Sequence, residues 1–270
     1  KPSSAASDVY KRQSQTRMHR TYKSAGRFIA LPLAAFLLSA CAAHNDVAVG
    51  DPVNDLQGQR AATERRLATA ATDAMTAGKT GEALVSYEKL YQRDSRNPDV
   101  AVNYAQLLRR SGKAGQAVKV LKPYAEGSRK VSSRAPLPML KNEYAAALIE
   151  TGKFAPAEKM LQSVLSNPAD SEFHPDASHL NGVALDAQGK HTEAEKYFRQ
   201  ALDGWRGDAT SVMNNLALNL ASQGKFDEAL TILRKAQIMA PAKTEIARNI
   251  QIVSELRDAV VPKAPVSLKP

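Results

Sequence analysis

Apolar residues along most of this chain recur at fixed distances from five Gly-Lys pairs. Seven positions before the glycine of each pair stands a small residue, and four positions before it stands an Ala or a Leu. Five positions after the glycine stands an Ala, and nine positions after it stands a bulky residue. Apolar positions three or four residues apart share one face of a helix, so the pattern predicts a helix on each side of every glycine. The glycines are Gly78, Gly112, Gly152, Gly189 and Gly224, at intervals of 34, 40, 37 and 35 residues.

Each position in this pattern has a physical role in joining two helices. A glycine just past a helix end enters the left-handed backbone conformation without steric cost, so it ends the first helix. Glu82, Glu193 and Glu228 directly precede an alanine and suit the opening turn of the second helix, where a carboxylate interacts well with the helix dipole. The alanine allows close approach of the two helices, and the bulky residue one turn later fills the space between them. Helix pairs repeated at this period predict an all-α solenoid.

The same pattern sets the predicted domain limits. Helix pairs extend over roughly residues 64–241, and Thr244–Asp258 fits one more first helix that caps the stack. We therefore predict a solenoid over residues 61–258 and a disordered, proline-containing tail over residues 259–270. Two longer connections between repeats are expected as loops, at residues 126–136 and 169–176.

The repeated unit resembles the tetratricopeptide repeat. This resemblance implies about five helix-pair repeats followed by a C-terminal capping helix. An aromatic residue is usual near the start of the first helix of that repeat, but residues such as Leu67 and Met213 stand there in this chain. Asn181 also occupies a position at which a core leucine is usual, so we expect looser packing in the fourth repeat.

The N-terminal region has the features of a bacterial lipoprotein signal. Basic residues after Met18 lead into the mostly apolar segment Phe28–Leu38. As a helix, that segment would rise only ~16 Å, against about 30 Å for the apolar core of a membrane, so it does not predict a membrane span. Leu38-Ser39-Ala40-Cys41 resembles the lipobox, whose cysteine is acylated and becomes the mature N-terminus. Ala42, directly after it, implies sorting to the outer membrane; the alternative is a buried core cysteine preceded by a chance Leu-Ser-Ala.

These features divide the first sixty residues into three predicted parts. Residues 1–17 precede a plausible start methionine and are interpreted as an upstream scar, and residues 18–40 are interpreted as the signal peptide. Residues 41–60 are polar and unpatterned, and they are predicted to form a flexible tether from a lipid on Cys41. Cys41 is the only cysteine of the chain, so a disulfide within one chain is excluded. The predicted location is the periplasmic face of the outer membrane.

The charge of the chain is concentrated in the part predicted to be removed. The formal net charge is +10, which by itself suggests a nucleic-acid partner. Residues 1–40 contain seven of the 37 basic and one of the 27 acidic residues, so the remainder has 30 and 26 and a charge of +4. That balance is ordinary for a protein surface, and we predict no nucleic-acid binding.

Candidate chemistry is sparse. Gly78-Lys79-Thr80 resembles the end of a phosphate-binding loop, but the glycine required five residues earlier is Asp73. His174, Asp176 and His179 form the only tight group of possible metal ligands, which a solvated loop and helix start explain more simply. We therefore predict no enzyme activity, no cofactor and no metal.

A binding surface remains as the main functional prediction. First helices of such solenoids line a concave groove that holds peptides or partner helices. Polar side chains there can satisfy the N–H and C=O groups of an extended peptide; the alternative is an inert, solvated face. The repeat register places these residues in the groove: Asn103, Gln106, Arg109, Arg110, Asn142, His179, Asp186, Asn214 and Asn215.

Three segments extend the resemblance to a narrower family. They are HLNGVALDAQGK (179–190), SVMNNLALNLASQGK (211–225) and APAKTEIARNIQ (240–251). With the lipobox, they resemble the TadD lipoproteins of bacterial tight-adherence systems, which assemble Flp pili. The resemblance implies a pilotin-like outer-membrane lipoprotein that helps the pilus secretin reach or assemble in that membrane. We therefore expect the groove to capture a segment of the secretin or of another pilus component. Two alternatives are a lipoprotein scaffold that recruits cell-wall enzymes and a metal-dependent accessory site at His174 and His179.

Overall fold

A computed structural model describes residues 52–128 and 137–260 of the chain. Within these ranges it contains eleven α-helices, one short 3-10 helix and no strand. In chain order they are α2 (Pro52–Thr76), α3 (Thr80–Arg93), α4 (Pro98–Arg110), α5 (Ala114–Ala125), α6 (Leu137–Glu150), α7 (Phe154–Leu165), η1 (Pro168–Phe173), α8 (His174–Ala187), α9 (His191–Gly204), α10 (Thr210–Ser222), α11 (Phe226–Met239) and α12 (Thr244–Val260).

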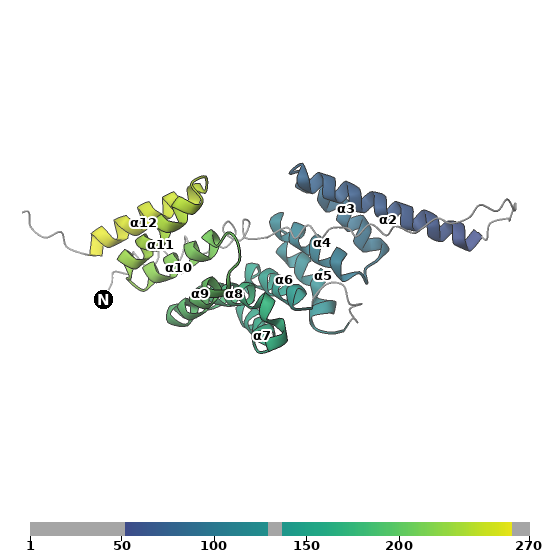
Figure 1. The fold of residues 1–270 in the computed structure, drawn as a ribbon. Helices are drawn as coiled ribbons and strands as arrows, with labels where there is room; N and C mark the ends of the chain where they lie inside the picture. The colour runs from purple at the N-terminus through teal and green to yellow at the C-terminus, as the bar shows by residue number, and fades with distance from the viewer. Residues whose placement is uncertain (1–51, 129–136, 261–270) are drawn as a thin grey trace, which may run out of the picture.

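The helices pack as five consecutive pairs followed by one unpaired helix. α2 packs on α3, α4 on α5, α6 on α7, α8 on α9 and α10 on α11, while α12 closes the stack against α10 and α11. The first helices α4, α6, α8, α10 and α12 also contact one another in a row. Figure 1 shows an open arc, with α4 and α6 on its inner side and α5 and α7 on its outer side. The predicted all-α solenoid is confirmed.

The repeated glycines end the first helices as expected. Gly78, Gly112, Gly152, Gly189 and Gly224 have φ angles of 70°, 74°, 73°, 78° and 77°, in the left-handed region that an L side chain enters only with strain. The lysine after each glycine closes the turn: Lys113 N–H, for example, donates to the Leu108 carbonyl at 2.8 Å. This arrangement satisfies a helix-end carbonyl and turns the chain back into the second helix.

The predicted contact positions form the core of every pair. Each alanine five residues after the repeated glycine is 0% exposed, so the two helices cross at close range there. The bulky residues one turn later are also buried, at 9% or less. They are Tyr87, Leu121, Leu161, Phe198 and Leu233. The core is therefore a continuous strip between first and second helices.

Some boundaries differ from the sequence-based expectation. α2 already begins at Pro52, inside the segment predicted as a tether, and its first proline has the fixed φ that suits a helix start. α12 continues to Val260, two residues past the expected end of the solenoid. The predicted loop at 169–176 contains most of η1 and the start of α8. Asn167 caps η1 by accepting from the Ala169 N–H at 3.2 Å.

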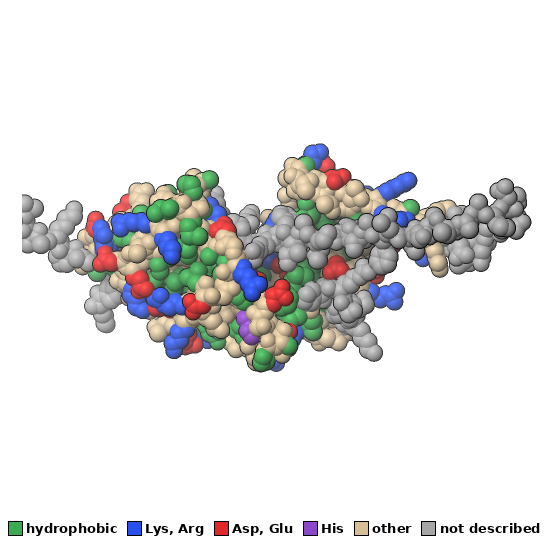
Figure 2. Space-filling model, in the orientation of Figure 1, with side chains coloured by type: hydrophobic (Ala, Val, Ile, Leu, Met, Phe, Trp, Pro, Cys, Tyr) green, Lys and Arg blue, Asp and Glu red, His purple; other side chains and the backbone are tan. Residues whose placement is uncertain are grey.

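Several predictions fall outside the described residues. The scar, the signal peptide and Cys41 precede residue 52, and most of the predicted loop at 126–136 and of the C-terminal tail is also outside. None of the helices that are described combines the length and apolar composition required to cross a membrane. On the face that Figure 2 shows, Lys and Arg are interspersed with Asp and Glu among the coloured residues.

Asn181 gives a stability prediction at the position noted in the sequence. Its side chain is buried in α8, and its Oδ1 has no hydrogen-bond partner within the described ranges. A buried unsatisfied polar atom costs about 1–3 kcal/mol, so Asn181→Leu is expected to raise the free energy of unfolding by about 1–2 kcal/mol in urea denaturation.

Asn249→Leu is the matched control for this prediction. Asn249 is equally buried, but its Nδ2 donates to Asn214 Oδ1 at 2.5 Å, so the same replacement is expected to destabilise the protein. A loss of stability of similar size in both variants would contradict the prediction for Asn181.

Candidate interaction surface

The predicted partner-binding residues lie on four neighbouring first helices. α4 carries four of them, α6 one, α8 two and α10 two. These four helices form one row, here called the inner face. The structure brings together the helices that the repeat register predicted. Some of the predicted side chains on them are bonded within the chain, and others have polar atoms without a partner among the described residues.

Arg109 is bonded within the inner face. Its Nη1 lies 2.5 Å from Glu143 Oε1, and its Nη2 lies 3.0 Å from Glu150 Oε1. All three side chains are at most 10% exposed, so α4 and α6 are joined by a buried ion-pair triad, here called the Arg109 triad. Burial lowers the pKa of the neighbouring Arg110, while the nearby Glu143 carboxylate opposes this shift. Arg109 therefore joins two repeats and is not a free cation.

A ladder of polar side chains joins α8, α10 and α12. Asn249 Nδ2 donates to Asn214 Oδ1 at 2.5 Å, and Asn215 Nδ2 lies 2.9 Å from His179 Nε2. Burial lowers the pKa of His179 to about 4, so the ring is neutral near pH 7 and this nitrogen can accept. The Trp205 ring meets the His179 ring edge-on at 5.7 Å between centroids. Three predicted groove residues therefore already bind one another or α12.

Unsatisfied polar groups remain on α4 and α6. Asn103 and Gln106 are half-buried on α4, and neither makes a hydrogen bond or ion pair with another described residue. Asn142 on α6 donates from Nδ2 to the Phe173 carbonyl at 3.2 Å, whereas its buried Oδ1 has no partner in the described part of the chain. Among the predicted partner-binding residues, the side chains with unused hydrogen-bonding atoms therefore lie on α4 and α6, and those of Asn103 and Gln106 are the ones only half-buried.

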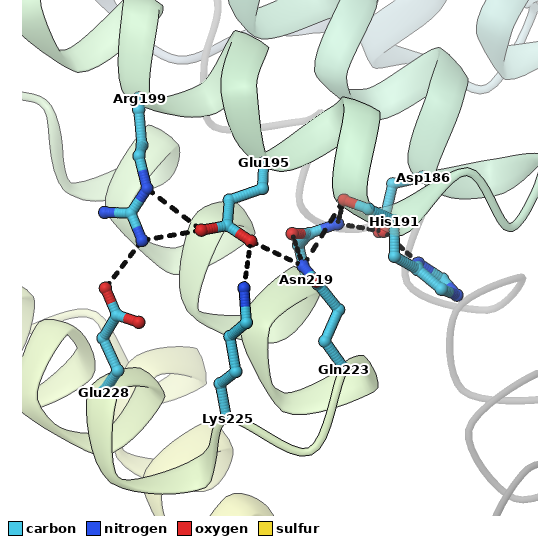
Figure 3. Close-up of polar contacts among 8 residues, drawn as sticks. All are labelled: Asp186, His191, Glu195, Arg199, Asn219, Gln223, Lys225 and Glu228. Atoms are coloured by element: carbon cyan, nitrogen blue, oxygen red, sulfur yellow. Dashed lines mark hydrogen bonds and ion pairs between the residues drawn. The ribbon is translucent and has the colours of Figure 1, made fainter.

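A larger polar network connects the fourth and fifth repeats (Figure 3). Glu195 is at its centre and accepts from Lys225 at 2.7 Å, from Arg199 at 2.8 Å and from Gln223 at 2.9 Å. Burial alone would raise the pKa of Glu195, but hydrogen bonds from these three side chains outweigh it and lower the pKa to about 2. Arg199 also reaches Glu228 on α11 at 2.6 Å. The network therefore holds α9, α10 and α11 together.

Asp186 belongs to the same network. Its Oδ1 lies 2.7 Å from His191 Nδ1 and accepts from Asn219 Nδ2 at 2.7 Å. The hydrogen bond to Asp186 raises the pKa of His191, and partial burial opposes that shift. Asp186 was predicted to face a peptide groove, but its carboxylate is bound to two side chains of this chain. The sequence holds no signal for this pairing, because Asn219 is 33 residues away.

The raised pKa of His191 predicts a pH dependence of stability. The stabilisation is fully present below the unfolded pKa of about 6.5 and is lost as the pH rises through the higher folded value. His191→Gln should therefore reduce stability more at about pH 5.5 than at about pH 8.5, by up to about 1 kcal/mol for a partly exposed pair. Thermal unfolding at both pH values measures this; Asp186→Asn should remove the difference, and a loss independent of pH would contradict the prediction.

The structure separates the histidines considered as metal ligands. His174 Nε2 lies 3.1 Å from the Val164 carbonyl and 3.0 Å from the Asn167 carbonyl, whereas His179 pairs with Asn215. In the described part of the chain, no three His, Cys, Asp or Glu side chains are close enough to hold a metal ion. The metal-dependent alternative therefore has no support in this geometry.

Comparison with known proteins identifies the repeat. Tetratricopeptide-repeat family models match residues 74–134 and 175–241. The chain thus contains tetratricopeptide repeats, and its fold is a tetratricopeptide-repeat solenoid of a kind suited to protein–protein interaction. No curated protein matches the sequence.

Solved structures agree with this fold. A thermophilic tetratricopeptide-repeat protein of Thermus thermophilus is 18% identical with a TM-score of 0.57, over 71% of this chain and 99% of that one. A tetratricopeptide-repeat protein of Parabacteroides merdae is 16% identical with a TM-score of 0.51, over 73% and 75%. A chain of the Cut9–Hcn1 hetero-tetramer of the APC/C is 16% identical with a TM-score of 0.60, over 75% and 38%. At these identities the likeness concerns the fold alone.

Proposed function

We propose that this protein is an adaptor that binds an extended segment of a partner protein across α4 and α6. The observation that carries the proposal is the uneven distribution of hydrogen bonding on the inner face. Among the predicted partner-binding residues, those on α8 and α10 are bonded within the chain, whereas the half-buried Asn103 and Gln106 on α4 have no partner among the residues that the structure describes. Amide side chains can both donate and accept, so they match the N–H and C=O groups of a peptide backbone.

The lipobox resemblance supports a second part of the proposal. Acylation of Cys41 would hold the adaptor at the periplasmic face of the outer membrane, where anchoring confines its search for a partner to a thin layer. The resemblance to TadD lipoproteins supports the secretin of a tight-adherence pilus as that partner. In this role the adaptor assists secretin assembly in the outer membrane and performs no reaction of its own.

Site-specific cross-linking tests the binding surface. A photoreactive amino acid in place of Gln106 is expected to capture a secretin segment in cells, whereas the same group in place of Gln116, exposed on α5, is not. Asn103→Ala with Gln106→Ala should weaken binding of that segment about tenfold, because each lost hydrogen bond contributes about 0.5–1.5 kcal/mol. Capture of cell-wall hydrolases or synthases at position 106 would favour the scaffold alternative, and equal capture at both positions would reject the surface.

Fractionation tests the anchor separately. Cys41→Ser is expected to move the protein from the membrane to the soluble periplasmic fraction, because the acyl chains would supply the membrane affinity. Cys41→Ser protein that stays with the membrane would reject the lipid anchor while leaving the α4–α6 surface untouched.

A further inference from the structure

A pocket separate from the predicted partner-binding residues lies between α5, α6 and α7. Its volume is about 310 Å³, at the lower end of the range for ligand sites. The lining residues, here called the α5–α7 pocket, are Ala125, Glu126, Lys141, Tyr144, Leu148, Pro156, Lys159, Met160 and Ser163. Lys141, Tyr144 and Leu148 are spaced three and four residues apart, so they share one face of α6. That face is rotated by roughly 100°, the rotation of one residue, from the face that carries Asn142.

The repeat pattern shows which residue type is missing beside the pocket. Lys141 precedes Gly152 by eleven positions, as Leu67 and Met213 precede their own repeated glycines. This is the position at which a tetratricopeptide repeat usually carries an aromatic ring. The lysine side chain instead donates to Ser163 Oγ at 3.0 Å, so no ring from position 141 occupies the space above Leu148 and Met160.

The charges around the pocket favour an anionic neighbour. Neither Lys141 nor Lys159 has a carboxylate partner among the described residues. The one carboxylate of the lining, Glu126, accepts from Tyr144 Oη at 2.8 Å and lies 3.8 Å from Lys122 Nζ, so it is already bound. Within the described ranges, two cations of the pocket lining therefore have no carboxylate partner.

The lining also suits an aromatic ring. Thioethers make favourable contacts with ring edges, and ammonium groups bind ring faces; Met160, Lys141 and Lys159 supply these groups. Leu148 and Pro156 add apolar contact area. A ring in this pocket would occupy the volume that the usual internal aromatic residue fills in the repeat.

We infer that the α5–α7 pocket is a second docking site, which takes an aromatic side chain next to an acidic residue in a partner protein. The partner's aromatic ring enters the pocket at the repeat position where this chain has Lys141 in place of an aromatic residue. The adjacent carboxylate pairs with Lys159 or Lys141. This site lies outside the proposed α4–α6 surface, so an experiment can reject either proposal and leave the other standing.

Titration with short peptides tests the site directly. The probe is N-acetyl-Asp-Trp-amide, and the readout is the ¹³C-methyl resonance of Met160, assigned from a Met160→Leu sample. We expect a saturable shift with a dissociation constant on the order of 1 mM. N-acetyl-Asp-Ala-amide should leave the resonance unchanged, and N-acetyl-Asn-Trp-amide should bind about threefold more weakly. Absence of a Met160 shift, or equal shifts with all three peptides, overturns the inference.

Filling the pocket from within separates a docking site from a packing defect. Lys141→Trp restores the usual aromatic residue, so it is expected to abolish the response of Met160 to the peptide. Ser163→Trp at the exposed rim provides the same test if Lys141→Trp does not fold, as judged by circular dichroism. Unchanged peptide binding in a folded filled variant overturns the inference.

Two further variants address charge and location. Lys159→Met should weaken N-acetyl-Asp-Trp-amide more than N-acetyl-Asn-Trp-amide, because only the first peptide also loses an ion pair. The Asn103→Ala, Gln106→Ala double variant should bind the probe as the unmodified protein does. A loss of probe binding in that double variant would place the peptide on the inner face and overturn the assignment.

Discussion

Arg109→Met is expected to lower the free energy of unfolding by about 3–5 kcal/mol. The Arg109 guanidinium neutralises Glu143 and Glu150 in a space where all three side chains are at most 10% exposed. Its removal takes away the cation that bonds both buried carboxylates, and removing one partner of a buried ion pair is strongly destabilising. Urea denaturation followed by circular dichroism measures the change.

Two control variants isolate the cause. Arg248→Met, an exposed position on α12, should change stability by less than about 0.5 kcal/mol. Replacing Arg109, Glu143 and Glu150 together by Met should restore most of the loss, because no charge of the triad then remains buried. If the triple variant is less stable than Arg109→Met alone, the loss arises from packing and the ion-pair explanation is incorrect.

Gly182→Ala is expected to destabilise the protein by about 1–3 kcal/mol, although glycine is normally the poorer helix former. Gly182 lies within α8 and faces Phe198 of α9. An added Cβ would lie 2.7 Å from two atoms of the Phe198 ring, closer than van der Waals contact permits. The Phe198 side chain is 1% exposed, so it is enclosed by the core. Thermal and urea unfolding both report the loss.

The same substitution elsewhere provides the control. Gly115 is in α5, and a Cβ added there meets nothing within 4 Å, so Gly115→Ala should raise stability by about 0.5–1 kcal/mol. Phe198→Leu in the Gly182→Ala background should recover part of the loss, since other repeats combine Ala with Leu at these two positions. If Gly182→Ala stabilises the protein as much as Gly115→Ala does, the Phe198 ring moves aside for the added methyl group and the prediction is wrong.

The helix pairs could be predicted because their determinants are local. The repeated glycine needs only its own backbone conformation to end a helix, and the alanine and bulky residue that follow lie on one face of the next helix. Five repetitions of this arrangement excluded a chance pattern. The start of α2 at Pro52 was missed because Pro52–Arg60 is polar and lacks the repeat spacing, so no apolar face indicated a helix there.

The candidate site was predicted only in part, because hydrogen bonding between repeats is not local. The register correctly placed the predicted residues on first helices, and Asn103 and Gln106 retain amides there that are free of partners within the described ranges. It gave no indication that Asp186 is bound to Asn219 or that Asn214 is bound to Asn249. Those partners are 33 and 35 residues away, and which polar groups meet depends on how adjacent repeats stack.

The amino-acid sequence by itself determined the repeated helix pair, the turns between the helices and the apolar strip that joins them. Each of these depends on residues within about one repeat, whose spacing is visible in the chain. Only the tertiary structure decided which polar side chains remain without a partner in the described part of the chain, and that Lys141 lines a pocket. Whether a polar side chain has a partner depends on contacts between successive repeats. One residue's position there changes the partners of its neighbours, so these contacts are known only once the repeats are stacked.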